Sequence, residues 1–196
     1  RWCAPDEPVA RADDAGLLYG HGAFETVRLY RGRPVALTRH LDRLSTTLEA
    51  LGIDAELVGL GAAGSELAQR AGPAHEAAAR LIITAGAATG RPLRVVSAGP
   101  LPPGVLQRRL GAPAVSVAGL TRSPATHKTL AWLPSLLARR QAPAGTEPVF
   151  VTPSDELLEG ATANLFVREG DGWLTPPADR CLPGVTRALV LLAAQR

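Results

Sequence analysis

The sequence predicts an α+β protein of two domains. Segments in which apolar and polar residues alternate, as in strands, are mixed with segments in which leucines recur every three or four residues, as in helices. A chain of 196 residues suits one large domain or two small ones, and a polar loop at 120–124 follows the last strand of the first half. We therefore expect a small N-terminal domain at 1–120 and the start of a larger C-terminal domain at 121–196.

The first elements expected are a β-hairpin over 17–37 and a helix. Residues 24–30 alternate with a period of two, a turn of Arg, Gly and Pro residues follows, and 35–37 form the expected return strand. Thr38 is the expected N-cap of a helix at 39–51, whose leucines face one side.

Further segments complete the first domain. An Ala- and Leu-rich stretch at 55–71 predicts a helix, although its internal glycines weaken it. Short apolar runs at 80–84, 93–98 and 114–118 are typical of buried strands, and Pro- and Gly-rich loops join them.

The second half alternates in the same way. It predicts a helix, two strands, a hairpin and a last helix, over 128–142, 149–151, 157–159, 163–167 with 172–175, and from 183 onward. Pro134 falls inside the first of these helices, where a proline would kink it. The end of the sequence is thus expected to be helical.

Composition limits the class of partner. Apolar residues make up 46% of the chain and charged residues 20%, which suits a packed core rather than a disordered chain. Apolar runs fall far short of the roughly 18 residues that a membrane span requires. The net charge is only +3, aromatic residues make up 4% and the arginines are scattered, which is unlike a nucleic-acid surface. We expect neither a membrane nor a nucleic acid as partner.

Cysteine and histidine patterns predict no metal site. Cys3 and Cys181 are too few for a disulfide scaffold or a four-cysteine zinc site, and neither His21 nor His127 has a partner at metal-ligand spacing. The N-terminal stretch has no apolar core of the kind that a secretory signal contains. These observations favour a reducing, cytoplasmic environment.

One lysine stands out. Among the 21 Lys and Arg residues, all but Lys128 are arginine. Arginine can replace lysine wherever a positive charge suffices, but a guanidinium does not deprotonate in a protein and cannot attack a carbonyl. Lys128 lies between His127 and Thr129 with apolar residues after it, where partial desolvation favours a neutral, nucleophilic amine. The count alone is equally compatible with a lysine that was retained by chance.

Three other features suit a ligand with a phosphate and a ring nitrogen. Residues 183–187, Pro-Gly-Val-Thr-Arg, look like a helix start, where backbone N–H groups and a hydroxyl can bind phosphate. Arg43 lies on an early helix, where it could make a bidentate phosphate contact. Glu159 follows a strand and precedes a glycine-containing turn, where a carboxylate could bond a protonated ring nitrogen.

Each of these features has a simpler alternative. Arg43 could pair with Asp42 or Glu49 on a solvated helix face. Glu159 could be an ordinary surface acid, and residues 184–186 could be no more than a helix cap. The alternatives do not explain why all the features occur in one chain in this order.

Together these features resemble the fold-type IV pyridoxal-phosphate enzymes, also called class IV aminotransferases. The family includes aminodeoxychorismate lyase, D-amino-acid aminotransferase and branched-chain aminotransferase. The matching motifs run in the family's order from about residue 9 to the end, and they are 14–28 (DAGLLYGHGAFETVR), 40–44 (HLDRL), 127–130 (HKTL), 159–166 (EGATANLF) and 182–187 (LPGVTR). The fold implied is the two-domain fold of D-amino-acid aminotransferase.

The resemblance implies a cofactor and a role for each candidate residue. Lys128 would bind pyridoxal 5'-phosphate covalently and later act as a general base. Arg43 would contact the phosphate of the cofactor, and Glu159 would bond the pyridine nitrogen and keep it protonated. Val185 and Thr186 would hold the phosphate through backbone N–H groups and a hydroxyl.

The resemblance also implies a reaction and an assembly. Thr26 is expected to contact the substrate or its leaving group, and Thr in place of Gly after Glu25 favours aminodeoxychorismate lyase over branched-chain aminotransferase. That lyase converts 4-amino-4-deoxychorismate to 4-aminobenzoate and pyruvate, in folate biosynthesis. Family members are homodimers. They also continue beyond the length of this sequence, so we expect the C-terminal domain to be incomplete here.

Two other functions stay open. A class IV aminotransferase acting on D-amino or branched-chain amino acids would use the same cofactor-binding residues. A non-catalytic relative acting as a binding protein would keep the fold without turnover. In both enzymes Lys128 would remove the proton from the substrate Cα, and the fate of the negative charge that remains would decide between elimination and transamination.

Overall fold

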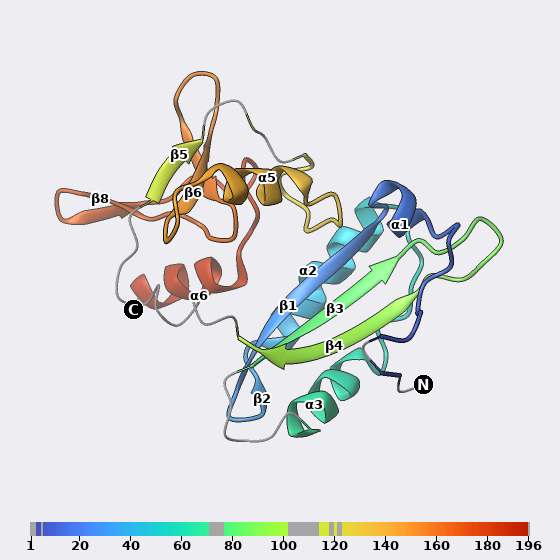
Figure 1. Cartoon of the computed structure of the whole chain (residues 1–196). Coiled ribbons are helices and arrows are strands. Elements are labelled where there is room, and N and C mark those ends of the chain that lie inside the picture. The colour runs from blue at the N-terminus through green and yellow to red at the C-terminus, as the bar shows by residue number, and fades with distance from the viewer. Residues whose placement is uncertain are drawn as a thin grey trace. The chain divides into compact units, whose positions relative to one another are not determined.

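The computed structural model shows a mixed α/β chain that divides into two compact units (Figure 1). One unit comprises Arg1–Pro100 with Thr129–Ala131, and the other Leu101–Lys128 with Trp132–Arg196. The sequence placed a boundary near residue 120, in a stretch that is described only in part, so that boundary stays a prediction. The described residues are 3–4, 6–70, 77–101, 114–117, 120 and 123–195.

A four-stranded antiparallel sheet forms the first unit. β1 (Gly22–Tyr30) lies between β2 (Arg33–Pro34) and β3 (Ala77–Thr84), and β4 (Arg94–Pro100) pairs with β3, which gives the order β2-β1-β3-β4. In β1 buried and accessible side chains alternate in its second half, as the sequence pattern predicts. The alternation determines which side chains of β1 face the core.

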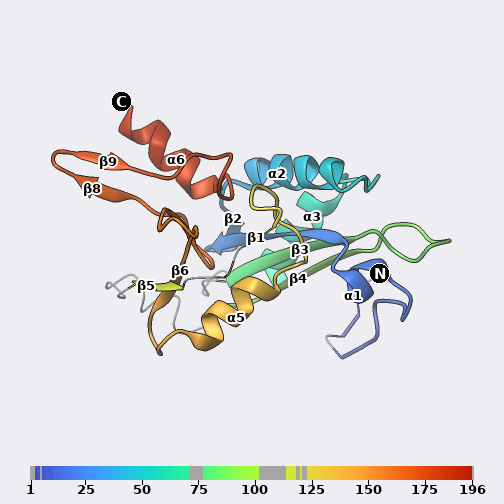
Figure 2. The ribbon, with the colours of Figure 1, turned by 90° about the horizontal axis from the view of Figure 1, so that it is seen from above.

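One face of this sheet carries the core of the first unit. α2 (Leu37–Ala50) and α3 (Leu60–Arg70) pack against that face, and Figure 2 shows α2 running along it. The buried apolar side chains come from both layers, and they are Ala23, Val27, Leu44, Leu48, Ile53, Leu60, Leu81 and Ile83. Apolar burial contributes about 25 cal/mol per Å², so this helix-on-sheet contact stabilises the unit.

The hairpin is shorter than predicted, and the helix after it begins earlier. The return strand is only Arg33–Pro34, followed by one hydrogen bond of 2.9 Å from the Val35 N–H to the Arg28 carbonyl, so the strand expected at 35–37 is wrong. α2 begins at Leu37 rather than at residue 39, and its N-cap is Ala36, with φ of 51°, rather than Thr38. Leu37 packs against the core cluster, which explains why the helix includes it.

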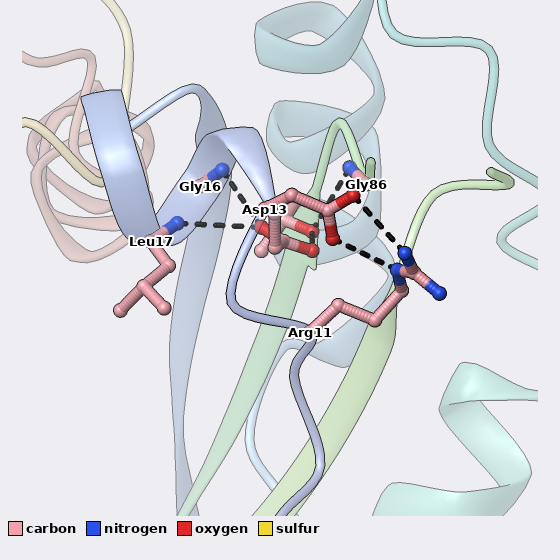
Figure 3. Close-up of polar contacts among 7 residues, drawn as sticks. Arg11, Asp13, Gly16, Leu17 and Gly86 are labelled. Carbon is pink, nitrogen blue, oxygen red and sulfur yellow. Dashed lines mark hydrogen bonds and ion pairs between the residues drawn. The ribbon is translucent and has the colours of Figure 1, made fainter. Parts of the chain in front are cut away.

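The chain before β1 forms a short helix, α1 (Ala15–Tyr19), where the sequence analysis expected the hairpin to begin. The Asp14 carboxylate accepts hydrogen bonds from the N–H groups of Gly16 (2.7 Å) and Leu17 (3.3 Å). It also accepts one from the Thr84 hydroxyl at 2.7 Å. Thr84, 70 positions from Asp14, therefore completes the cap, and the N–H of Gly86 donates to the Thr84 hydroxyl. Figure 3 shows Gly16, Leu17 and Gly86 in this region.

The second unit is built on a smaller sheet. β6 (Glu147–Val151) lies between β5 (Ala114–Val117), to which it is parallel, and β7 (Leu157–Gly160), to which it is antiparallel. β8 (Val167–Glu169) and β9 (Gly172–Leu174) form a separate hairpin. Of the helices in the part of the chain that is described, none is both long and apolar enough to cross a membrane.

The helix predicted at 128–142 is shorter in the structure. α5 spans Leu133–Gln141 and packs against β6, so Lys128 lies in the loop before it. Pro134 occupies the first turn of α5, where its missing N–H has no partner to lose. The proline therefore begins this helix instead of kinking it.

Candidate functional site

Glu159 is a buried acid at the end of β7. It pairs with Phe150 of β6 and is only 5% exposed, which excludes the reading of Glu159 as an ordinary surface acid. Its Oε2 accepts a hydrogen bond of 3.1 Å from the backbone N–H of Leu182. A buried carboxylate is costly without polar contacts, so this N–H both stabilises and orients it.

A tight turn follows Glu159 and is anchored on β6. The N–H of Gly160 donates to the carbonyl of Ala163 at 2.7 Å, and the N–H of Ala161 donates to the carbonyl of Pro148 at 2.9 Å. The backbone N–H and the hydroxyl of Thr162 both donate to Glu147, each at 2.7 Å. These contacts give the turn a defined conformation that does not depend on a ligand.

The last helix, α6 (Val185–Ala194), starts without an acidic cap. Its N-cap is Gly184, in an extended conformation that supplies no side-chain hydrogen bond, and its first turn contains no acidic residue. The side chain of Val185 is buried and that of Thr186 is exposed at the helix start. The first N–H groups of a helix lack partners inside it and lie at its positive end, so this start suits an anion.

Asn164 joins the turn to the segment before α6. Its Nδ2 donates to the carbonyl of Leu182 at 2.9 Å. Its Oδ1 lies where a Cβ on residue 184 would be, so a larger residue at that position would displace the Asn164 side chain. Asn164 lies within the motif at 159–166, but its role could not be predicted from the sequence, because its partner Leu182 is 18 residues away.

The loop between β9 and α6 is held at several points. Arg187 donates from Nε to the Thr175 hydroxyl at 3.0 Å and from Nη2 to the carbonyl of Pro176 at 2.8 Å. The buried thiol of Cys181 lies 3.4 Å from the carbonyl of Pro177. Arg187 is a second residue whose role sequence reasoning missed, and a long-range contact again explains why.

Lys128 belongs to the same unit as Glu159, Val185 and Thr186. It is half-buried and lies in the loop before α5. The next residue, Thr129, forms an isolated bridge with Ala23 at the start of β1 and belongs to the first unit. The chain therefore passes from one unit to the other at the predicted catalytic lysine.

Arg43 lies in the first unit, in a buried ion pair that joins α2 to β1. Its Nε and Nη2 donate to the two oxygens of Glu25 at 2.7 and 2.8 Å, and Nδ1 of His40 lies 2.7 Å from Oε2 of the same carboxylate. The acid it pairs with is thus neither Asp42 nor Glu49, which the sequence offered as alternatives. Glu25 itself is fully buried.

The electrostatics of this network favour an ionised Glu25. Burial by itself would raise the pKa of the carboxyl, but hydrogen bonds from His40 and Arg43 and their charges outweigh burial and lower the pKa below its usual value. The side chains of both partners are mostly buried as well. This ion-pair network therefore links α2 to β1.

Thr26 lies in the first unit on the sheet face opposite the helices. Its side chain is exposed, while the neighbours on either side, Glu25 and Val27, are buried on the core face. Across the strand pair it faces Arg80, whose guanidinium lies 4.6 Å from the centre of the Phe24 ring. The Thr26 hydroxyl is thus presented on the accessible face of β1.

The second unit brings together groups that fit a phosphorylated heterocycle. Glu159 is buried and oriented, the start of α6 has no acid of its own, and Gly184 has no side chain that would displace Asn164. A carboxylate suits a protonated ring nitrogen and a helix start suits a phosphate. The described residues contain no group of three His, Cys, Asp or Glu that could hold a metal ion.

Comparison with known proteins identifies relatives along nearly the whole chain. The family described as amino-transferase class IV matches residues 22–196. A Methanocaldococcus jannaschii protein, provisionally named a branched-chain-amino-acid aminotransferase, is 33% identical over 97% of this chain and 72% of its own length. The aminodeoxychorismate lyase of Bacillus subtilis is 28% identical over 97% of this chain and 70% of its own length.

Solved structures show the same fold. A hypothetical aminotransferase from Mycobacterium tuberculosis, solved with α-ketoglutarate and PMP bound, superposes with a TM-score of 0.88 at 28% identity, over 98% of this chain and 74% of its own. The same Mycobacterium protein has also been solved in a PLP-bound form.

Proposed function

The chain belongs to the class IV aminotransferase family, and we propose that it is the member that converts 4-amino-4-deoxychorismate to 4-aminobenzoate and pyruvate. It is a pyridoxal-phosphate-dependent enzyme, and the predicted type IV fold is confirmed. The lyase assignment is the finer step. It is supported by the Bacillus subtilis relative, which is named as that lyase.

The observation that carries the lyase proposal is the position of Thr26. From the family resemblance, Thr26 is expected to contact the substrate or its leaving group. The side chain of Thr26 is exposed on β1 between two buried neighbours. A hydroxyl at this place can donate a hydrogen bond to a departing oxygen, which a glycine cannot do.

Lys128 and Glu159 would perform the central chemistry. Bound pyridoxal phosphate supplies an electron-withdrawing ring that stabilises negative charge on the substrate carbon next to the amine. We propose that Lys128 would hold the cofactor covalently and that its amine, when free, would take the proton from that carbon. Glu159, buried and oriented by the N–H of Leu182, would keep a proton on the ring nitrogen.

Val185 and Thr186 would hold the phosphate. Val185 and Thr186 begin α6, where backbone N–H groups and the exposed hydroxyl can donate to an anion. Arg43 is assigned to the phosphate by resemblance, and its two bonds to Glu25 keep its guanidinium in one orientation.

An aminotransferase is the second candidate, and a specific finding favours it. The Methanocaldococcus relative, at 33% identity, is provisionally named a branched-chain-amino-acid aminotransferase, whereas the lyase relative is 28% identical. A Mycobacterium tuberculosis relative is named as both a lyase and a D-amino acid transaminase. Since the relatives named here are aminotransferases and lyases, the non-catalytic alternative has no support among them.

Two measurements test the proposal. Borohydride reduction of the protein incubated with pyridoxal phosphate should label one peptide, the one that contains Lys128, and Lys128→Ala should abolish both labelling and turnover. With 4-amino-4-deoxychorismate, the lyase should release pyruvate and 4-aminobenzoate in equal amounts, and Thr26→Val should slow that release. Amino transfer to a keto acid without pyruvate release would instead establish the aminotransferase.

We also propose that the active enzyme is a homodimer in the cytoplasm. The dimer is an expectation from the family. The cytoplasm is favoured because both cysteines, Cys3 and Cys181, are free thiols. Light scattering coupled to size-exclusion chromatography should give twice the mass of the chain, and a monomeric mass in the active enzyme would contradict the dimer.

A further inference from the structure

We propose that Asn164 is a positioning residue that sets the spacing between the Glu159 carboxylate and the start of α6. The spacing would match the protein to a ligand with a ring nitrogen at one end and a phosphate at the other. This inference rests on the proposed cofactor roles of Glu159 and α6, and it assigns a task to a side chain that makes neither contact.

The first link is the peptide of Leu182, which is held from both sides. Its N–H donates to Glu159 Oε2 at 3.1 Å, and its carbonyl accepts from Asn164 Nδ2 at 2.9 Å. Glu159 and Asn164 are the two ends of one turn. Both ends of the turn therefore bind the same residue, Leu182, of the distant segment. Through this contact Asn164 would determine the position from which the Leu182 N–H donates to the Glu159 carboxylate.

The second link runs from Asn164 to the helix. Its Oδ1 packs against Gly184, so closely that a Cβ there would collide with it. Gly184 is the N-cap of α6, and its carbonyl accepts the N–H of Ala188 at 2.9 Å, the first bond of the helix. One amide side chain thus touches the residue that orients Glu159 and the residue from which α6 begins.

The surroundings of Asn164 are held by other contacts. Thr162 binds Glu147 on the β6 side of the turn, and Arg187 ties α6 to the carbonyl of Pro176. Removing the Asn164 amide should therefore leave both the turn and the helix formed. What it removes is the connection between them, so the expected defect concerns spacing rather than folding.

The chemistry explains why the residue is an asparagine. An amide offers a donor to the Leu182 carbonyl together with a compact oxygen against Gly184. Asn164→Asp would conserve neither the charge nor the donors, because a carboxylate would face the Leu182 carbonyl without a proton to donate. Asn164→Ala would remove both contacts and add no charge near the helix start, which makes it the cleaner test.

The test compares two ligands that differ only in the phosphate. Dissociation constants for pyridoxal phosphate and for pyridoxal are measured by absorbance, without substrate, for the wild-type protein and for Asn164→Ala. We expect Asn164→Ala to weaken pyridoxal phosphate about tenfold, the effect of one or two lost hydrogen bonds. Pyridoxal has no phosphate, so its binding does not depend on the spacing between Glu159 and the start of α6. It should bind almost as before. Equal weakening of both ligands, or of neither, would overturn the proposal.

Controls separate this outcome from misfolding and from failure of the proposed function. Thr146→Val removes one comparable side-chain bond, 2.7 Å to the carbonyl of Pro143, in an exposed turn of the same unit, and should change neither affinity. If Asn164→Ala does not fold, Asn164→Ser takes its place. The same change is then expected in the ratio of the dissociation constant of pyridoxal phosphate to that of pyridoxal. A wild-type protein that is not labelled at Lys128 would refute the cofactor assignment, whereas labelled protein with an unchanged ratio would refute only the role of Asn164.

Discussion

Two helices of this chain begin in opposite ways. The start of α1 is closed by the Asp14 carboxylate, which accepts from two N–H groups of the first turn. The start of α6 follows Gly184 and has neither a side-chain cap nor an acid in its first turn. Since N-terminal N–H groups need an acceptor, the first helix supplies its own anion and the second is suited to receive one.

The two buried glutamates differ in the same sense. Glu25 in the first unit is oriented by the charged side chains of Arg43 and His40. Glu159 in the second unit accepts a hydrogen bond from a backbone N–H, that of Leu182. The comparison teaches that burial of an acid does not by itself identify its role.

The largest effect is expected from disrupting the buried ion-pair network of the first unit, formed by Glu25, Arg43 and His40. Glu25→Gln leaves Arg43 and His40 buried beside a neutral amide, and we expect unfolding to become easier by about 3 kcal/mol. Urea denaturation measures this loss. A loss below about 1 kcal/mol would show that the network contributes no more than a surface pair and would remove the contrast between the two glutamates.

The same network predicts a dependence on pH. Because the folded protein lowers the pKa of Glu25, ionised Glu25 adds stability that is complete above the usual glutamate pKa of about 4.3 and is lost as the pH falls through the lowered value. The stability difference between wild type and Glu25→Gln should therefore be constant near neutral pH and shrink in acid. A difference that grows in acid would contradict the assigned direction.

The next prediction makes α6 resemble α1. Gly184→Asp would place a carboxylate at the helix start and a Cβ against Asn164, and we expect pyridoxal phosphate to bind about a hundredfold more weakly. Gly184→Ala adds the Cβ without the charge and should weaken binding less. Fluorescence titration measures both, and equal affinities in the two variants would show that charge at the helix start is unimportant.

The converse change removes the N-cap of α1. Asp14→Ala removes the acceptor for Gly16, Leu17 and the Thr84 hydroxyl, and should lower the free energy of unfolding by about 1–2 kcal/mol. Asp14→Asn keeps a good capping oxygen and should cost less. Thermal unfolding followed by circular dichroism compares the two, and an equal loss in both would show that the charge matters rather than the cap.

The smallest effect is expected at an exposed ion pair of the second unit. Arg180 and Glu156 lie 2.7 Å apart, which lowers the pKa of Glu156, but both side chains are about half exposed. Solvent and salt screen such pairs, so Arg180→Ala should leave the melting temperature unchanged at physiological salt. A clear drop would mean that the loop near Cys181 depends on this pair.

Local pattern was enough to predict most of the fold. Alternation over 24–30 and the leucine spacing of the helix after it are properties of neighbouring residues, and both elements are present as β1 and α2. Element ends were less accurate where they depend on packing or on a single proline, as at Leu37 and Pro134. Lys128 could be singled out because it is the only lysine.

By itself, the sequence determined the periodicity, the turns and the motifs, because each depends on residues within a few positions of one another. Only the tertiary structure decided that Arg43 pairs with Glu25, that Thr84 completes the cap of α1, and that Asn164 reaches the segment before α6. These partners lie from about 18 to 70 positions apart. Such contacts are created when sheets and loops bring distant segments together, and no local spacing encodes them.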